Sequence, residues 1–283
     1  MAGITLGQNN YGKSRVRMVK VSREGARHTV REISVDIALE GDFRAIHCSG
    51  DNANCLPTDT MKNTVYALGK NHPLDSIESF ALHLAEHFVK KTAPVSSARV
   101  RISQVPWDRV QIDGKEHTHT FTKGTEERQT CEVRVARNGP TTLAGGIRDF
   151  VILKSTDSAF AGYMKDPFTT LPETRDRIFA TSVTADWQYN DGARDFAQAR
   201  TQIRDALVRT FAAHKSESVQ QTLYAMGEAA LQRCAAISRI RLSLPNKHCL
   251  LINLQPFGME NPNEIFVPTD EPHGLIEATI ERS

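Results

Sequence analysis

Two short stretches of the sequence place polar side chains at the predicted start of a helix. Pro57–Thr60 offers a threonine hydroxyl, and Ser216–Gln220 offers a glutamine side-chain amide. The first N–H groups of a helix have no partner within it and carry partial positive charge, which suits a flat anion. Serine and threonine more often serve as simple helix caps, so each stretch also fits a purely structural role.

Two histidines, His117 and His119, stand at i and i+2, on one face of a predicted strand. Imidazole nitrogens are common zinc ligands, and His47, Cys48 or Cys131 could supply the others. Two ligands alone do not define a zinc site, and exposed strand histidines give the same pattern. The sequence therefore leaves a zinc site open as an alternative.

Further candidates lie in the second half of the chain. Asn246–His248 follow Pro245 between two predicted strands, so an amide, an ammonium and an imidazole meet at a sheet end and could transfer protons. Phe160 has small neighbours, and core packing is its simplest role. Arg177 opens a predicted strand next to Asp176, where a surface ion pair is the simplest interpretation.

Several large function classes lack support. The chain has no GxGxxG after a strand, no P-loop, no GxSxG and no HExxH, so dinucleotide, nucleoside-triphosphate and serine-hydrolase chemistry are not indicated. Lys and Arg number 35 against 33 Asp and Glu, a balance that predicts neither nucleic-acid nor membrane binding. No apolar run approaches the roughly 20 residues that cross a bilayer.

Length and composition indicate a folded globular protein. With 283 residues, 40% hydrophobic and 24% charged, the chain can bury roughly three quarters of its unfolded surface. The five cysteines show no CxxC spacing, and Met1–Gly3 do not begin a signal peptide, so reduced thiols and a cytoplasmic location are expected. The C-terminal Glu281–Ser283 is not a peroxisomal signal.

Periodicity predicts the order ββααββ in the first half of the chain. Residues 14–21 and 33–39 read as strands, and 59–70 as a helix. A second helix follows Pro73, where Asp75 and Glu78 have the spacing of a capping box and apolar residues form one stripe. Residues 98–105 and 117–122 are the two further strands.

The second half repeats that order. Strands are predicted at 146–154 and 178–189, helices from Phe196 and from Val219, and strands at 238–244 and 248–254. Ala98–Ser103 matches Ser238–Ser243 in residue class at every position, after the second helix of each half. We expect an α+β fold of two repeats, 9–137 and 138–283. Each has an antiparallel sheet covered by helices on one face, and closure of several units into a barrel would protect the sheet edges.

Short motifs spread over about 265 residues make the chain resemble the urate oxidase (uricase) family. The motifs are Asn10–Lys13, Thr58–Thr60, Lys62–Tyr66, Ile112–Lys115 with His117 and His119, Leu153–Thr156, Thr170–Leu171, Asp176–Arg177, Ser218–Gln220, Leu244–His248 and Gly274–Ile276. The resemblance implies the tunnelling fold (T-fold), with tandem ββααββ repeats and subunits that close into barrels. It also implies a homotetramer with active sites at subunit interfaces. The implied reaction is oxidation of urate by O2 to 5-hydroxyisourate and H2O2, without metal or organic cofactor.

The same resemblance implies how the substrate is held. Arg177 would clamp urate with its guanidinium, and Gln220 would add a matching amide edge. The backbone N–H of Val219 would supply another donor at the helix start. Phe160 would stack on the purine face, and Ile276 would line the pocket.

It also implies how protons are moved. Thr58 and the amide of Asp59 would reach the substrate from the neighbouring subunit. Lys13 beside Thr58 would be the base, its pKa lowered by burial, and His248 would extend the proton relay. Asn246 would hold O2 and later the attacking water above the ring.

Two other interpretations remain open from the residues themselves. One is a zinc-dependent pterin enzyme of the same fold that uses His117 and His119. The other is a scaffold that binds a purine or a partner protein without catalysis. Lys13, Thr58 and His248 together favour catalysis, because a binding protein has no need of a proton relay.

Overall fold

The structure is a computed structural model that describes residues 3–283. Met1 and Ala2, part of the stretch in which no signal peptide is predicted, lie outside the described residues. Contacts divide the chain into two compact units, Met1–Gly146 with Gln188–Ala197 and Ile147–Trp187 with Gln198–Ser283. This division does not test the predicted repeats at 9–137 and 138–283, which concern internal duplication of the sequence.

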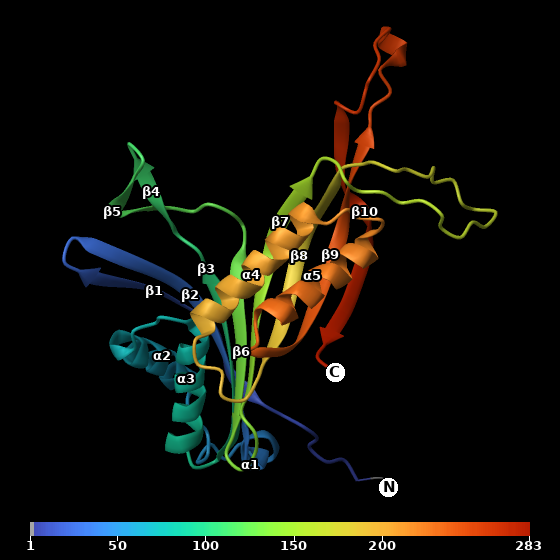
Figure 1. Cartoon of the computed structure of the whole chain (residues 1–283). Helices are drawn as coiled ribbons and strands as arrows, with labels where there is room; N and C mark the ends of the chain where they lie inside the picture. Colours follow the sequence, from blue (N-terminus) through green and yellow to red (C-terminus); the bar gives the residue numbers. More distant parts are fainter. Residues whose placement is uncertain (1–2) are drawn as a thin grey trace. The chain divides into compact units, whose positions relative to one another are not determined.

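The first unit contains the strands β1, β2, β3 and β6 of the main sheet, with helices on one face (Figure 1). Its elements are β1 (Tyr11–Glu24), β2 (Arg27–Gly41), α1 (Arg44–Cys48), α2 (Thr58–Asn71), α3 (Ile77–Lys91), β3 (Val95–Val105), β4 (Asp108–Ile112), β5 (Lys115–Thr122) and β6 (Arg128–Ala136). The strands lie in the order β1-β2-β3-β6 and pair antiparallel. Helix α3 packs on β3 and β6, and α2 packs on β1. One sheet face is therefore available to build a core and the other carries polar side chains.

The core of this unit follows the predicted periodicities. Alternate residues of β2 are buried, as are the stripe residues of α3. These are Ile33, Val35, Ile37 and Leu39 in β2, and Ile77, Phe80, Ala81, Leu84 and Phe88 in α3. Both patterns are confirmed. Each large apolar side chain contributes roughly 1.5–3 kcal/mol when fully buried, so the core fixes which face of every strand is turned to the helices.

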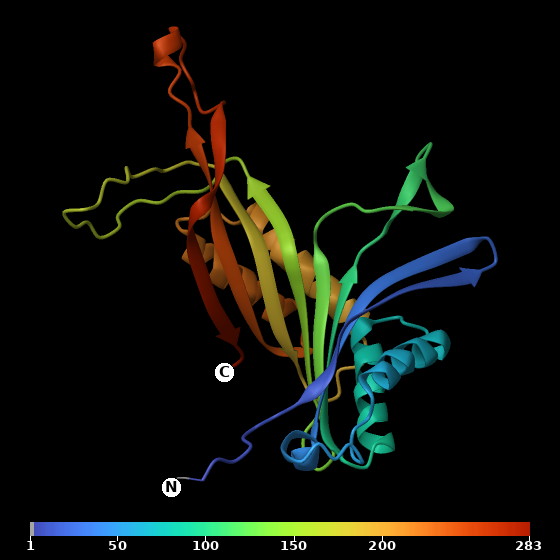
Figure 2. The same ribbon diagram turned by 180° about the vertical axis from the view of Figure 1, so that it is seen from behind.

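The second unit is built from the remaining strands and two long helices. Its elements are β7 (Thr142–Lys154), β8 (Phe179–Tyr189), α4 (Phe196–Ala213), α5 (Val219–Arg233), β9 (Ile237–Leu251), the 3-10 helix η1 (Gln255–Phe257) and β10 (Phe266–Glu281). Residues 142–146 of β7 and 188–189 of β8 belong to the first unit. The strand order is β7-β8-β9-β10. Figures 1 and 2 show α4 and α5 on one face of these strands and the other face without them.

Helix α5 lies close against the last two strands. A Cβ added to Gly227 of α5 would approach Ile280 Cδ1 of β10 to 2.6 Å, so a larger residue there would displace the Ile280 side chain. The predicted apolar stripes of α4 and α5 are buried, and so are Phe179, Val183 and Trp187 of β8. The two matching hexapeptides, Ala98–Ser103 and Ser238–Ser243, lie in β3 and β9, the strands that follow α3 and α5.

The prediction that residues 117–122 form the fourth sheet strand of the first half is wrong. These residues belong to β5, which pairs with β4 in a separate two-stranded hairpin. Asp113 and Gly114 both have positive φ, the conformation of a two-residue hairpin turn, for which Asp-Gly is a strong signal. The fourth sheet strand is β6, whose alternate residues Cys131, Val133 and Val135 are buried.

The predicted turn at residues 245–248 is also wrong. β9 runs without interruption from Ile237 to Leu251 and pairs with β10, a strand the periodicity did not reveal. The prediction rested on Pro245, but the φ of proline is compatible with extended backbone wherever no ladder N–H is needed. Pro245 lies opposite Leu275 in this pairing.

The predicted capping box of the second helix is replaced by a different cap. Ser76 is the N-cap of α3, and its hydroxyl accepts a hydrogen bond from Ser79 N at 3.1 Å. Asp75 instead accepts from the hydroxyl of Ser79. Glu78 is buried and accepts a 2.9 Å hydrogen bond from the Tyr189 hydroxyl, so it serves tertiary packing rather than the cap. No helix in residues 3–283 is both long and apolar enough to span a membrane.

Candidate active site

Lys13 lies at an irregularity in β1 that determines the direction of its side chain. It pairs with Ile37, which is buried beneath the helices, and paired residues of antiparallel strands share a face. The register then shifts between Lys13 and Val16, so that β1 advances by three residues where β2 advances by two. The extra residue is taken up at Arg15, which has a positive φ and donates its N–H to Asp36 Oδ1 at 2.7 Å. Lys13 and Val16 can therefore both face the helices.

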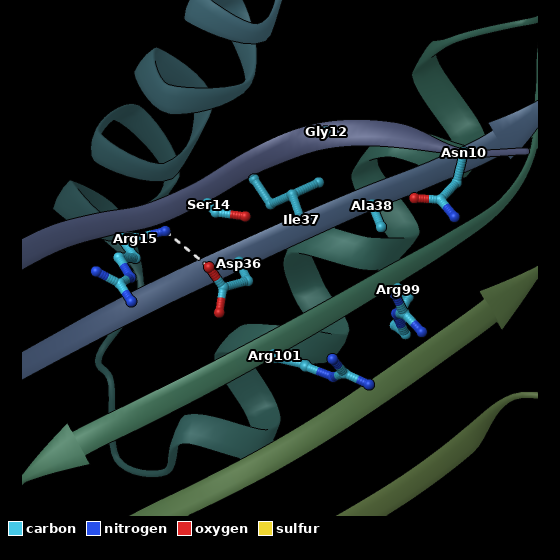
Figure 3. A pocket seen from close by; sticks show the side chains of 9 residues that line it. All are labelled: Asn10, Gly12, Ser14, Arg15, Asp36, Ile37, Ala38, Arg99 and Arg101. Carbon is cyan, nitrogen blue, oxygen red and sulfur yellow. Dashed lines mark hydrogen bonds between the residues drawn. The ribbon is translucent and has the colours of Figure 1, made fainter.

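A cavity of about 370 Å³ lies on the opposite side of this bulge (Figure 3). It is lined by Asn10, Gly12, Ser14, Arg15, Asp36, Ile37, Ala38, Arg99 and Arg101. None of the predicted site residues lines this cavity. The candidate site of the first unit therefore lies on the helix-covered side of β1, at the start of α2.

Helix α2 begins at Thr58 without a side-chain cap, because the preceding residue is Pro57. Thr58, which is half-buried, and Asp59 form the first turn, where backbone N–H groups lack helical partners. The Asp59 carboxylate accepts a hydrogen bond from Lys62. That bond, and more weakly the charge of Lys13, lowers the pKa of Asp59.

In the second unit, backbone hydrogen bonds hold Phe160 next to the start of α5. Phe160 and Thr174 exchange two such bonds, at 2.8 and 3.0 Å. The neighbouring Ala159 N donates to Ser216 O at 2.7 Å, and Ser216 N donates to Asp157 O at 2.9 Å. The phenyl ring is half-buried, so the simple core role is wrong, and its position relative to α5 is set by main-chain contacts.

Arg177 lies beside that ring with unused hydrogen-bonding capacity. Its guanidinium carbon is 5.7 Å from the centroid of Phe160, and its Nε is buried without a hydrogen-bond partner among residues 3–283. Burial lowers the pKa of Arg177. The expected surface ion pair with Asp176 is absent from the described part of the chain, and Asp176 instead accepts from Thr156 Oγ1 at 3.0 Å. A half-buried guanidinium with a buried, unpaired Nε and no carboxylate partner is suited to an anionic ligand.

The start of α5 presents donors without a competing carboxylate. Ser218 is the N-cap and accepts from Gln221 N at 3.1 Å, and the first turn contains no acidic residue. Val219 buries its side chain in the core, which fixes its backbone N–H at the helix end. Gln220 is exposed. These features match the predicted donor pair of Val219 N–H and the Gln220 amide.

Asn246, His248 and Ile276 lie on the two strands against α5. Asn246 pairs with Gly274, and a Cβ built on Gly274 would lie 3.7 Å from Ile276 Cδ1 and 4.0 Å from Asn246 Cβ. The side chains of Asn246 and Ile276 therefore both lie next to Gly274. His248, two residues from Asn246, shares its face. The predicted turn is absent, but the strand itself brings these groups together.

The connection between α5 and β9 determines which end of α5 lies near Asn246, His248 and Ile276. Only residues 234–236 join the two elements, so the chain reverses and β9 runs back along the helix. Helix α5 is about 21 Å long, whereas β9 covers about 30 Å from Ile237 to Asn246. Asn246 therefore lies beyond the N-terminal end of α5, the end that carries Val219 and Gln220.

His117 and His119, which the zinc alternative would use, lie next to each other, but they are not part of a complete set of metal ligands. His117 and His119 have ring centroids 4.6 Å apart. Across residues 3–283, no group of three or more His, Cys, Asp and Glu side chains has an arrangement that could hold a metal ion. His47, Cys48 and Cys131, the suggested further ligands, do not complete the site.

Two tyrosines next to predicted site residues were assigned no role from the sequence. Tyr163 stacks on Phe160 with centroids 4.8 Å apart and an interplanar angle of 15°. The Tyr11 hydroxyl accepts a hydrogen bond from Leu56 N, two residues before Thr58. Tyr163 lies in a segment without periodicity, so only its aromatic character close to Phe160 could have indicated this contact. Tyr11 stands within the motif Asn10–Lys13, which could have drawn attention to it.

Comparison with known proteins gives a consistent result over nearly the whole chain. The family profile described as Uricase matches residues 9–134 and 143–277. A uricase of Arthrobacter globiformis is 44% identical over 279 residues, covering 99% of this chain and 90% of the relative. A uricase of Cyberlindnera jadinii is 38% identical over 98% of this chain and 97% of its own length, and one of Oryctolagus cuniculus is 36% identical over 97% and 94%.

Solved structures agree with this similarity. The crystal structure of uricase from Arthrobacter globiformis superposes with a TM-score of 0.93 at 43% identity, covering 99% of this chain and 96% of that one. A uricase from Bacillus fastidious, at 23% identity, has a TM-score of 0.84 over 99% and 94% of the two chains, which indicates the same fold. The α+β architecture with its long antiparallel strands is thus shared with these proteins.

Proposed function

The chain belongs to the uricase family and is a urate oxidase, and we propose that the residues described above carry out its reaction. Urate, O2 and water are converted to 5-hydroxyisourate and H2O2. Urate supplies two electrons, O2 accepts them, and water provides the oxygen that is added to the ring. The observation that carries the proposed site is the buried Nε of Arg177, which has no partner among the described residues and lies beside Phe160 near the start of α5.

Arg177, Gln220 and Phe160 bind the substrate in this proposal. The guanidinium and the side-chain amide form paired hydrogen bonds with one edge of the flat anion, and Val219 N–H adds a third donor. Phe160 stacks on the purine face. The absence of acidic residues in the first turn of α5 supports this role, because a carboxylate there would repel urate. Ile276 limits the pocket on its apolar side.

Lys13, Thr58 and His248 transfer the protons. Lys13 accepts a proton through the hydroxyl of Thr58, and His248 passes protons between substrate, water and solvent. The amide of Asp59 binds the second edge of the purine. Asn246 holds O2, and later the attacking water, above the ring by hydrogen bonds. The lowering of the Asp59 pKa by the charge of Lys13 supports the closeness of lysine and helix start.

The site would be completed by a second copy of the chain. Thr58 and Asp59 of one subunit would contact the purine held by Arg177 and Gln220 of its neighbour, in a homotetramer whose sheets close into a barrel. The polar face of the first-unit sheet, which carries Asp36, supports an assembly in which that face lines an aqueous tunnel. None of the five cysteines, which all lie among the described residues, is in a disulfide, and this supports a cytoplasmic site of action.

The decisive experiment adds urate to protein that has been treated with a chelator. We expect the ultraviolet absorbance of urate to disappear while O2 is consumed and H2O2 is released in equal amounts. Loss of activity after chelation, with recovery on adding zinc, would contradict the proposal and favour the use of His117 and His119. Binding of urate without O2 consumption would indicate a purine-binding scaffold instead.

A further inference from the structure

Tyr11 joins the strand that carries Lys13 to the segment that leads into Thr58. Its hydroxyl accepts a hydrogen bond from the backbone N–H of Leu56 at 2.8 Å, across 45 residues of sequence. Leu56 precedes Thr58 by two residues, and Tyr11 precedes Lys13 by two. A single hydrogen bond therefore connects the backbones on which both predicted proton-transfer groups are mounted.

The surroundings of Tyr11 restrict the movement of this hydroxyl. The ring packs edge-on against Phe43, whose side chain is buried, with centroids 4.7 Å apart. Burial, and the nearby thiol of Cys55, raise the pKa of Tyr11 to about 12. The phenol thus stays protonated across the working pH of an enzyme, and it acts as a hydrogen-bonding group rather than as a base.

The residue between Tyr11 and Lys13 makes this geometry rigid. A Cβ on Gly12 would lie 1.7 Å from the carbonyl oxygen of Ile37, so β1 approaches β2 more closely than any side chain would allow. Tyr11 pairs with Leu39 and Lys13 pairs with Ile37, which places both side chains on the helix-covered face. Movement of the Tyr11 hydroxyl relative to Lys13 is therefore restricted.

We propose that Tyr11 is a positioning residue for urate oxidation, which holds the Thr58 hydroxyl at the correct distance from Lys13. This inference rests on the proposed roles of Lys13 and Thr58. Tyr11 does not touch the substrate in this account. Its contribution is to fix the backbone of Leu56 and so the first turn of α2, since small displacements of reacting groups cost large factors in rate.

The test compares Tyr11→Phe with Tyr66→Phe, which removes a hydroxyl from the middle of α2. The Tyr66 hydroxyl is exposed and donates only a 3.4 Å bond to Arg17 O, so its loss should leave turnover unchanged. Tyr11→Phe should lower kcat about tenfold, with a smaller change in KM, because the ring stays packed while the link to Leu56 is lost. Equal kcat in Tyr11→Phe and wild type would overturn the inference.

A double-mutant cycle separates positioning from general destabilisation. In a Thr58→Ala background the hydroxyl to be positioned is gone, so adding Tyr11→Phe should change kcat by less than about twofold. A further tenfold loss in that background would show that Tyr11 acts independently of Thr58, which contradicts the proposal. If Thr58→Ala and Lys13→Met themselves retain normal turnover, the proposed catalytic roles fail instead, and the two failures are distinguishable.

Amide hydrogen exchange tests the contact without dependence on catalysis. The Leu56 N–H should exchange at least about tenfold faster in Tyr11→Phe than in wild type, while amides in the middle of α3 are unchanged. Wild-type protein offers the same check if the variant is unstable. An unprotected Leu56 amide in the wild-type enzyme would mean that the hydrogen bond does not persist in solution, and the inference would be abandoned.

Discussion

The starts of α2 and α5 have different proposed tasks, and their sequences differ as well. α2 has no side-chain cap, and its first turn contains Asp59, whose carboxylate is engaged by Lys62 within the same helix. α5 is capped by Ser218, and its first turn contains no acidic residue. Both starts leave backbone N–H groups without helical partners, but only α5 lies near a guanidinium, that of Arg177, whose buried Nε has no hydrogen-bond partner among the described residues.

In the proposed site, this difference gives the two helix starts different functions. In the first unit, the proposed proton-transfer residues Lys13 and Thr58 lie on a bulged strand and at the start of a helix. In the second unit, main-chain hydrogen bonds bring an aromatic ring and a guanidinium to the end of a helix, an arrangement suited to binding a flat anion.

The largest effect on kcat is expected from replacing the proposed proton-transfer residues Lys13 and Thr58. Lys13→Met and Thr58→Ala should each lower kcat by about two orders of magnitude or more, the usual size of a lost acid–base group. Lys70→Met, which removes an amine from the last turn of α2, is the matched control and should leave kcat unchanged. Steady-state kinetics with urate measures this. Near-normal turnover in both the Lys13 and the Thr58 variants would contradict the proposed role of the α2 start in proton transfer.

Replacing the proposed substrate-binding residue Arg177 should have a smaller effect, and mainly on KM rather than on kcat. Arg177→Gln should raise KM about 10- to 100-fold while kcat falls less, because charge-assisted hydrogen bonds to the substrate are lost. Arg175→Gln alters an exposed arginine two residues away and should have little effect. A fall in kcat with unchanged KM would place Arg177 in the chemical step and weaken the comparison.

The two serine caps offer a test in which stability and function separate. Ser76 caps α3 and Ser218 caps α5, each by accepting a hydrogen bond at 3.1 Å from the N–H three residues on. Ser76→Ala and Ser218→Ala should each lower the free energy of unfolding by about 1 kcal/mol. Only Ser218→Ala should also raise KM, since in the proposed site α5 carries substrate donors and α3 carries none. Equal KM values in the two variants would contradict the assignment of α5.

The smallest effect concerns alkaline stability. The pKa of Tyr11 is raised to about 12 in the folded protein, whereas an exposed tyrosine titrates near pH 10. The unfolded chain therefore loses this proton first, so the stabilisation is complete below about pH 10 and is lost as the pH rises toward 12. The unfolding midpoints of wild type and Tyr11→Phe should converge over this range. A constant difference from pH 9 to 12 would show that the tyrosine is not buried in solution.

Much of the fold could be predicted from local pattern. The alternation Ile33–Leu39 and the stripe from Ile77 to Phe88 identified the buried faces, because a strand repeats every two residues and a helix every 3.6. The errors arose where the structure depends on which strands pair with each other rather than on the local pattern. Residues 117–122 form a strand, but a tight turn at Asp113 joins them to β4 rather than to the main sheet.

The candidate site was predicted unevenly for the same reason. The starts of α2 and α5 follow from local signals, a proline and a serine cap, and the structure has both helices begin where these signals indicate. The neighbourhood of Phe160 could not be foreseen from periodicity. It depends on hydrogen bonds between segments some 60 residues apart, such as Ala159 N to Ser216 O.

The sequence by itself determined which residues are apolar at which period, where helices start, and which motifs relate the chain to its family. Those properties depend on neighbours within a few residues. Only the tertiary structure decided that β1 bulges after Lys13, that Tyr11 holds Leu56, and that the Nε of Arg177 is buried without a partner among the described residues. These features depend on the register between strands and on hydrogen bonds between distant segments, which packing of the whole chain selects.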